Sequence, residues 1–179
     1  MENQVLITGA SGGIGQAIAR AVAKAGYTVV AHYNRNAAPV ESLAQQIRAE
    51  GGNIRLLQFD ICNREQCQEV LEKDIAENGT YYGVVTNAGV CADMAFPAMT
   101  GEYWDKVINT NLNGFFNVVH PLVMPMCRKK RGRIITLSSK SRTSKLQCLQ
   151  GRPHWSYQSL GHRTGQSKHY RKQRGTRRD

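Results

Sequence analysis

The chain has 179 residues, with 24 Lys and Arg against 13 Asp and Glu, which gives a formal net charge of +11. This length is enough for one domain with a sizeable core. No stretch approaches the roughly 18 apolar residues of a membrane span, and the N-terminus lacks the regions of a signal peptide. The five cysteines are scattered and include no C-x-x-C pair. We therefore expect a cytoplasmic protein with no membrane partner, no structural metal and no disulfide framework.

The positive charge is concentrated after residue 139. Residues 1–139 carry 13 Lys and Arg against 12 Asp and Glu, whereas residues 140–179 carry 11 Lys and Arg against a single acid, Asp179. The aliphatic side chains of the second segment are only Leu146, Leu149 and Leu160. A segment this poor in apolar residues cannot bury a core. We predict an incomplete globular domain over residues 1–139 and a disordered basic tail over residues 140–179.

The first predicted elements are a strand at residues 5–7 and a helix that follows a glycine-rich turn. The continuous apolar run of the strand is typical of a parallel strand buried on both faces. Apolar residues then recur at helical spacing, at Ile14, Ala17, Ile18, Ala21, Val22 and Ala25. Gly26 stands where the cap at the end of this helix belongs.

Two more strand–helix units follow. Residues 28–33 form the second predicted strand. Pro39 then opens a helix whose apolar face is Val40, Leu43, Ala44 and Ile47. Residues 54–59 form the third strand, and Asn63 with Gln66 resembles a capping box at the start of the third helix.

The last predicted elements are a strand at residues 82–86, a long helix, and a strand at residues 134–137. The long helix has an apolar stripe that consists of Trp104, Val107, Ile108, Asn111, Leu112, Phe115 and Val119. We expect Pro121 and Pro125 to bend its end. Strands that alternate with helices through short connections predict an α/β fold with a doubly wound parallel sheet (Rossmann type), truncated after the fifth strand.

The turn between the first strand and the first helix reads T-G-A-S-G-G-I-G over residues 8–15. In that position, free backbone N–H groups and the positive end of the helix face a pyrophosphate. Glycines there allow a tight turn and close approach of the backbone. A simple glycine-rich turn is the alternative interpretation. We expect dinucleotide binding by Gly9, Ser11, Gly12, Gly13, Ile14 and Gly15.

The end of the second strand indicates which dinucleotide binds. NAD-binding sheets usually carry an acid about 20 residues beyond the glycines, where it meets a ribose hydroxyl. This chain has Ala31-His32-Tyr33-Asn34-Arg35 there, without an acid. Arg35 is placed to meet a 2′-phosphate instead, although it could also be a solvated loop residue. The sequence therefore favours NADP(H) as the cofactor.

Four motifs, in order, resemble the short-chain dehydrogenase/reductase family. They are the T-G-x-x-x-G-x-G spacing of the turn, Asn87-Ala88-Gly89, Thr110-Asn111-Leu112 and Leu137-Ser138-Ser139. The resemblance covers residues 1–139 and is most marked toward the bacterial β-ketoacyl-ACP reductases. It implies an NADPH-dependent oxidoreductase that acts on β-ketoacyl-ACP in fatty acid biosynthesis.

The resemblance also implies roles for single residues. It assigns catalysis to Asn111 and Ser139, and cofactor binding to Asp60, Ile61, Asn87, Ala88 and Gly89. Taken singly, Asp60 could cap a turn and Asn87 could order a loop. Asn111 and Ser139 could likewise be ordinary polar residues. Their joint occurrence in the family's order favours the functional interpretation.

Members of the family carry a Tyr-x-x-x-Lys pair after the segment that Ser139 matches. The Tyr delivers a proton to the substrate carbonyl, and the Lys lowers the pKa of that Tyr. Neither tyrosine of the tail fits, because Tyr157 is followed four positions later by Gly161, and Tyr170 by Arg174. We therefore expect this chain to be an inactive form of the reductase.

A shifted reading frame explains the tail. Residues 146–153 can be encoded CTA CAG TGC CTC CAA GGC CGG CCT, which one nucleotide later reads Tyr-Ser-Ala-Ser-Lys-Ala-Gly, the missing motif. With suitable codons the shifted frame continues into the helix and strand that follow in the family. We hypothesise that residues 140–179 are a frameshifted translation and that several codons are lost near the junction.

The partners follow from the charge and from the resemblance. Arg128-Lys129-Lys130-Arg131 could simply stabilise the end of the long helix, or it could meet the acidic acyl carrier protein, as such residues do in the resembled reductases. The family forms homo-oligomers through a helix that is missing here, so we expect an uncovered edge strand and poor solubility. An alternative function is an NADP-binding remnant whose basic tail binds nucleic acid nonspecifically.

Overall fold

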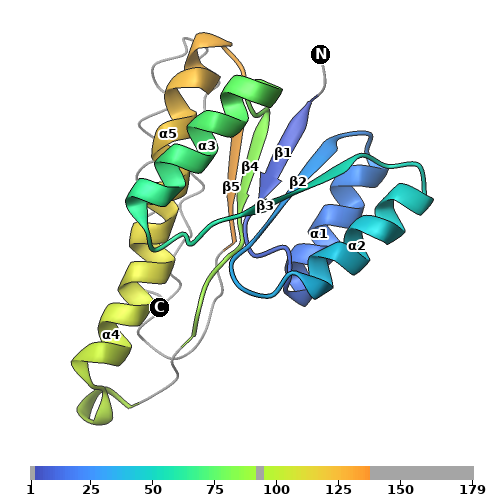
Figure 1. The fold of residues 1–179 in the computed structure, drawn as a ribbon. Helices are drawn as coiled ribbons and strands as arrows, with labels where there is room; N and C mark the ends of the chain where they lie inside the picture. The colour runs from blue at the N-terminus through green and yellow to red at the C-terminus, as the bar shows by residue number, and fades with distance from the viewer. Residues whose placement is uncertain (1–2, 92–94, 138–179) are drawn as a thin grey trace, which may run out of the picture.

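The computed structural model describes residues 3–91 and 95–137. Within these ranges, one parallel sheet has the strand order β3-β2-β1-β4-β5 (Figure 1). Its strands are β1 (Gln4–Ile7), β2 (Thr28–Tyr33), β3 (Ile54–Gln58), β4 (Gly83–Thr86) and β5 (Arg133–Thr136). The predicted doubly wound parallel sheet is confirmed. The tail predicted over residues 140–179 lies outside the described residues.

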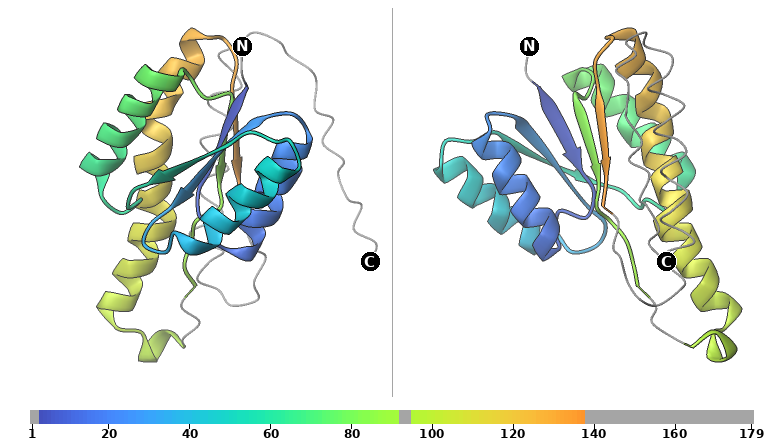
Figure 2. Two further views of the ribbon diagram at one scale, coloured as in Figure 1. Left: turned by 45° about the vertical axis from the view of Figure 1, so that its right-hand side comes forward. Right: turned by 180° about the vertical axis from the view of Figure 1, so that it is seen from behind.

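Helices cover both faces of the sheet. They are α1 (Gly13–Lys24), α2 (Ala38–Ala49), α3 (Arg64–Asn78), the 3-10 turn η1 (Phe96–Ala98), α4 (Gly101–Ile108), the π-helical segment η2 (Asn109–Asn113) and α5 (Gly114–Arg128). Helices α1 and α2 lie on one face, and α3 and α5 lie on the other (Figures 1 and 2). None of the helices in the described ranges combines the length and hydropathy needed to cross a bilayer.

Two hydrophobic cores lie on the two faces of the sheet. Val5 and Ile7 of β1 pack in the core beneath α1 and α2, whereas Leu6 packs in the core beneath α3 and α5. This alternation follows from the opposite directions of successive side chains in a strand. The apolar face predicted for α2 is confirmed, since its four members, Val40, Leu43, Ala44 and Ile47, are at most 2% exposed.

The apolar face predicted for α1 is partly wrong. Ile14 is 64% exposed, and Ala17, Ala21 and Ala25 are exposed as well. The helix instead buries Gly15 and Ala19 and packs Ile18, Val22 and Ala23 against the core. Alanines fit either face of a helix, so they did not fix its rotation. Gly15 fixes it, because this helix must approach the backbone of the preceding turn at that residue.

The long predicted helix is a continuous helical run that changes its pitch in the middle. Helix α4 passes into the π-helical segment η2, and α5 then continues through Pro121 and Pro125 to Arg128. That the prolines bend the end of the helix stays a prediction. The wider turn of η2 brings Asn111 to the loop after β4, as described below.

The start of α3 is capped at one position as predicted and differs at the other. Asn63 Oδ1 accepts the Gln66 N–H at 3.0 Å, which is the predicted cap. The side chain of Gln66 does not return to Asn63, because its Oε1 accepts the Asp60 N–H at 2.8 Å. This bond joins the start of α3 to the end of β3, next to the candidate site.

A buried polar cluster lies at the amino edge of the sheet, opposite the candidate site. Asp74 is 5% exposed and accepts hydrogen bonds from Arg55 at 2.5 Å, from Asn78 at 3.0 Å and from the Tyr81 hydroxyl. Arg55 also donates to Gln4 Oε1 at 2.6 Å. Burial disfavours the carboxylate, but the bonds from Arg55 and Tyr81 outweigh it and hold the pKa of Asp74 below its ordinary value. The cluster therefore joins α3 to β1 and β3.

Candidate functional site

The glycine-rich turn lies at the carboxyl ends of the strands, between β1 and α1 (Figure 1). Helix α1 begins with Gly12 as its N-cap, and no side chain caps it. Its first turn contains no acidic residue. Backbone N–H groups at a helix start without a side-chain acceptor, together with the positive end of the helix, form a site for a phosphate group.

Close contacts explain two of the glycines. A Cβ on Gly15 would lie 2.3 Å from the Gly9 carbonyl oxygen and 2.9 Å from Asn87 Nδ2. Gly9 has φ +64°, and a Cβ there would lie 2.9 Å from the Cα of Ala88. Both positions therefore require glycine, one for space and the other also for its backbone conformation.

Gly12 and Gly13, which lie between these two in the sequence, have more open surroundings. A Cβ on Gly13 would meet no atom within 4 Å, and one on Gly12 would only touch the Gly9 carbonyl oxygen at 3.6 Å. Ile14, the residue after them, exposes most of its side chain. The outer side of the turn is thus open backbone followed by an apolar side chain, a surface that fits a dinucleotide whose pyrophosphate approaches the main chain.

Thr8 and Asn87 tie the ends of β1 and β4 together. Thr8 Oγ1 accepts the N–H groups of Asn87 and Ala88, both at 3.0 Å. Asn87 Nδ2 donates in return to the carbonyl oxygens of Thr8 at 2.9 Å and Gly9 at 3.1 Å. These strands flank the point where the strand order reverses, and ligands of open α/β sheets bind at this point. Asn87 and Ala88 therefore shape the turn by hydrogen bonds to it.

His32 is a buried residue of this region that sequence reasoning did not single out. The residue is 2% exposed. Its Nδ1 lies 3.1 Å from the Gly9 nitrogen, and its Nε2 lies 2.9 Å from the Phe59 carbonyl oxygen. Burial lowers the pKa of His32 to about 4, although the Phe59 carbonyl and the charge of Asp60 act in the opposite direction. The only sequence signal was a polar side chain inside an otherwise apolar strand.

Asn111 lies in η2, and its side chain holds the loop after β4. Its Oδ1 accepts the Val90 N–H at 2.9 Å, and its Nδ2 donates to the Val90 carbonyl at 2.8 Å. A Cβ on Gly89 would lie 3.0 Å from Asn111 Oδ1. The segment predicted to hold the catalytic asparagine therefore packs directly on the predicted Asn87-Ala88-Gly89 motif.

A cavity opens where these elements meet. Its lining residues come from the turn after β1, the end of β4 and the loop after it, β5, the loop after β3 and the η2–α5 run, and they include Thr8, Thr86, Asn87, Gly89, Asn111 and Thr136. Leu137 lines it as well. Ser139, the second predicted catalytic residue, lies outside the described residues. The hydroxyl of Thr86 donates to Thr136 Oγ1 at 3.0 Å, so hydroxyl and amide groups converge at the carboxyl ends of the strands.

Asp60 and Ile61 follow β3 and have different environments. Asp60 Oδ1 accepts the Cys62 N–H at 2.9 Å, so one oxygen caps a turn, which was the alternative interpretation. The carboxyl is only partly buried. Ile61 is 7% exposed and lines the cavity, where a Cβ on Gly114 would lie 2.9 Å from its Cδ1. Ile61 therefore shapes the cavity wall through its packing.

The two predicted basic sites lie at opposite edges of the sheet. Arg35 is exposed directly after β2, at the carboxyl edge, and its guanidinium has no partner among the described residues. The basic run from Arg128 to Arg131 instead joins the end of α5 to the start of β5, at the amino edge. There Arg131 lies over the ring of Tyr82, with its Cζ 4.9 Å from the ring centre. Only Arg35 is on the side of the glycine turn.

The sequence of the chain matches the short chain dehydrogenase family over residues 3–150. The chain belongs to this family. The match extends past the domain boundary predicted at residue 139. The open glycine turn and the cavity beside it are consistent with a nicotinamide dinucleotide as the cofactor.

Relatives in this family include two reductases of thioester substrates. A 3-oxoacyl-acyl-carrier-protein reductase of Aggregatibacter actinomycetemcomitans is 48% identical over 142 residues, which are 79% of this chain and 59% of the reductase. An acetoacetyl-CoA reductase of Shinella zoogloeoides is 40% identical over 139 residues, which are 78% of this chain and 56% of that enzyme. The chain spans less than two thirds of the length of these short-chain dehydrogenases.

A solved dehydrogenase structure shares the fold. The crystal structure of a gluconate 5-dehydrogenase from Burkholderia cenocepacia, in complex with NADP and tartrate, aligns with a TM-score of 0.81. The alignment covers 92% of this chain and 67% of that chain at 24% sequence identity. At this identity the likeness supports the parallel α/β fold alone.

Proposed function

We propose that this chain carries the cofactor-binding part of an NADP(H)-dependent reductase of 3-oxoacyl thioesters. One observation carries the proposal: the turn from Gly9 to Gly15 is closed on its inner side by contacts that exclude any Cβ and is open on its outer side. Such a turn at the start of an uncapped helix suits a pyrophosphate. Arg35, exposed at the end of β2 where an acid would suit NAD, supports the 2′-phosphorylated cofactor.

The thioester substrate is proposed from the relatives and from the cavity. The relatives in Aggregatibacter and Shinella are named for 3-oxoacyl-ACP and acetoacetyl-CoA, which share a 3-oxoacyl thioester group. The cavity beside the turn has apolar walls, including Ile61 and Phe115, and it presents threonine and asparagine groups at the strand ends. A carbonyl with an acyl chain suits such a lining, and NADPH would supply the hydride for its reduction.

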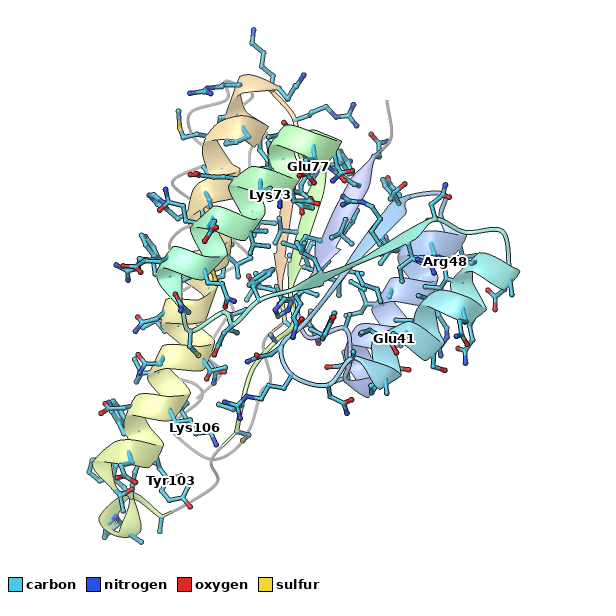
Figure 3. All side chains as sticks on the ribbon, in the orientation of Figure 1. Glu41, Arg48, Lys73, Glu77, Tyr103 and Lys106 are labelled. Atoms are coloured by element: carbon cyan, nitrogen blue, oxygen red, sulfur yellow. The ribbon has the colours of Figure 1, made fainter. Side chains whose placement is uncertain are left out.

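We also propose that the chain as written binds the cofactor without turnover. In all 179 residues, no tyrosine is followed four positions later by a lysine. Tyr103 and Lys106 are the nearest tyrosine and lysine on one described helix. They are three positions apart in the sequence, and both side chains are exposed on α4 (Figure 3). Without a positioned phenol, the reduction would lack its general acid, which is worth about 10²–10⁴-fold in rate.

The experiment is an NADPH fluorescence titration paired with a reduction assay on acetoacetyl-CoA. Saturable NADPH binding without measurable oxidation of NADPH is the expected result. Tighter binding of NADPH than of NADH would support the role of Arg35, and Arg35→Ala should remove that preference. Absence of dinucleotide binding would overturn the proposed function, and rapid turnover would overturn the proposed inactivity.

The frameshift remains a proposal about the gene, and DNA sequence tests it. Codons after the one for Ser139 are expected to spell Tyr-x-x-x-Lys when read one nucleotide later. Messenger RNA should contain the same junction if the shift is present in the organism. Codons that give no such string in the shifted frame would contradict the proposal.

A further inference from the structure

His32 occupies a junction of three chain segments at the carboxyl edge of the sheet. Its backbone belongs to β2, its Nδ1 meets the first glycine of the turn after β1, and its Nε2 meets Phe59, the first residue after β3. Its ring also packs against Phe59, with 4.1 Å between the ring centres. The backbone of His32 adds a further bond, because its carbonyl accepts the Ala10 N–H at 2.9 Å.

The two hydrogen bonds of the ring define its protonation state. A carbonyl oxygen only accepts, so the nitrogen facing Phe59 must carry the hydrogen. A backbone N–H only donates, so the nitrogen facing Gly9 must offer its lone pair. His32 is therefore neutral, with its hydrogen on Nε2. A protonated ring would place an N–H group against the Gly9 N–H, which would break the bond.

The bond to Gly9 bears on the shape of the dinucleotide turn. Gly9 has φ +64°, and its carbonyl accepts from Asn87 Nδ2 and the Gly12 N–H while it lies against Gly15. The N–H of the same residue is the group that His32 holds. The imidazole thus holds the N–H of Gly9, and the hydrogen bonds from Asn87 and Gly12 hold its carbonyl oxygen.

We propose that neutral His32 is a positioning residue for the dinucleotide, which holds the glycine turn in its binding shape through the Gly9 N–H and the Phe59 carbonyl. The proposal rests on the proposed function, since it concerns the turn that would receive the pyrophosphate. His32 does not touch the cofactor in this role. It couples the turn after β1 to the ends of β2 and β3, the segments that carry Arg35 and Asp60.

Protonation of His32 opposes cofactor binding. The charged group that acts on the ring among the described residues is Asp60, which favours the protonated form, whereas burial opposes it more strongly. Because the turn needs the neutral ring, affinity for the dinucleotide falls as pH approaches about 4. By linkage, a bound dinucleotide favours the neutral imidazole by the same factor.

Three substitutions separate the two bonds. Asn in place of His32 can present an acceptor near the position of Nδ1 but does not reach Phe59. Gln can reach Phe59 from the position of Nε2 but has no acceptor at Nδ1, and Leu fills space without either bond. We expect His32→Gln and His32→Leu to weaken NADP⁺ binding about tenfold, and His32→Asn by less than about threefold. Tyr81→Phe is the matched control, because it weakens the polar cluster at the other edge of the sheet.

The dissociation constant of NADP⁺ is measured by calorimetry on the full chain, at a temperature where circular dichroism shows each variant folded. The same constant is then followed for the native chain and His32→Asn from neutral pH downward. Weakening is expected to be steeper for the native chain, and the difference between the two isolates His32 from the titration of the cofactor. Nitrogen-15 spectra of labelled histidine are expected to show hydrogen on Nε2 at neutral pH.

The outcomes separate this inference from the function on which it rests. Unchanged affinity in His32→Leu and His32→Gln, with a lower melting temperature only, would make His32 a structural residue and overturn the inference. Hydrogen found on Nδ1 would overturn it as well. If the native chain binds no dinucleotide, both this inference and the proposed function fall. An equal loss of affinity in Tyr81→Phe would mean that global stability, and not the turn, sets the affinity.

Discussion

Single atoms decide which glycines of the turn can change. Gly13 and Gly15 are separated by one residue in the first turn of α1. A Cβ on Gly15 would meet backbone atoms that cannot move aside, whereas one on Gly13 would point into open space. Gly15 is therefore required by the fold of the chain. Gly13 is required only if a ligand approaches the backbone there.

The pair gives a matched test. Gly15→Ala is expected to lower the free energy of unfolding by about 2–3 kcal/mol, because the new methyl group must displace the turn. Gly13→Ala is expected to leave it unchanged or raise it by up to about 1 kcal/mol, since alanine favours a helix. NADPH binding should nevertheless weaken in Gly13→Ala. Urea unfolding and the NADPH titration check both results, and a stable Gly15→Ala variant would contradict the close contact.

The histidine of β2 makes stability depend on pH. Its pKa is near 6.5 in an unfolded chain and about 4 in the folded one. Between these values the unfolded state binds more protons, so the free energy of unfolding falls as pH falls from about 6.5 to about 4. The total loss from His32 is ~3 kcal/mol. Urea unfolding across this window is expected to show a flatter profile in His32→Asn, and identical slopes would contradict the assignment.

At the scale of elements, the π-helical segment η2 is the feature that places the cavity wall. The five residues of η2 interrupt the run of α4 and α5 and direct Asn111 at the loop after β4. A regular α-helix would place the same side chains in different directions, because the rotation per residue differs between an α-helix and a π-helix. The predicted apolar stripe therefore does not continue with one spacing through this run.

Removing the Asn111 side chain is expected to loosen the loop after β4. Asn111→Ala leaves the N–H and the carbonyl of Val90 without their partner, so unfolding free energy should fall by about 1–3 kcal/mol. Asn113→Ala, in the same segment, loses only its exposed bond to Asn109 and should cost less than about 1 kcal/mol. Thermal unfolding compares the two. Equal losses would mean that the Val90 bonds contribute nothing specific.

At the scale of the whole molecule, the sheet is covered unevenly. The strand β5 pairs with β4 alone among the described strands, and Ile135 is 55% exposed on it. Trp104 and Phe116 are also exposed by 43% and 47%. By contrast, the outer surfaces of α2 and α3 carry charged side chains such as Glu41, Arg48, Lys73 and Glu77 (Figure 3). An apolar strand at an edge favours association between chains.

We expect the chain to associate in solution through this edge. Ile135→Lys should shift size-exclusion elution toward smaller species without lowering stability, because the side chain already faces outward. Ile134→Lys is the contrasting variant, since Ile134 packs against the core beneath α3 and α5 and should unfold the chain when charged. A monodisperse monomer for the native chain would contradict the prediction.

The sequence by itself determined the order of the elements and the presence of the glycine turn. Apolar runs with short connections predicted each of the strands that the structure describes, and the spacing of the glycines predicted the turn that must approach its neighbours closely. These properties are local, because they depend on side-chain periodicity and on conformations that only glycine adopts. The tail from residue 140 and Ser139 stay predictions, since they lie outside the described residues.

Only the tertiary structure decided how the elements face one another. The rotation of α1, with Ile14 outward and Gly15 inward, follows from contact with Gly9 and not from its own apolar pattern. The pairing of Asn111 with Val90 joins segments 21 residues apart, and that of His32 with Gly9 joins segments 23 apart. Such contacts arise when segments distant in sequence become neighbours, so no periodicity along the chain encodes them. Packing therefore determined which side chains hold the turn, while sequence determined that a turn of this kind exists.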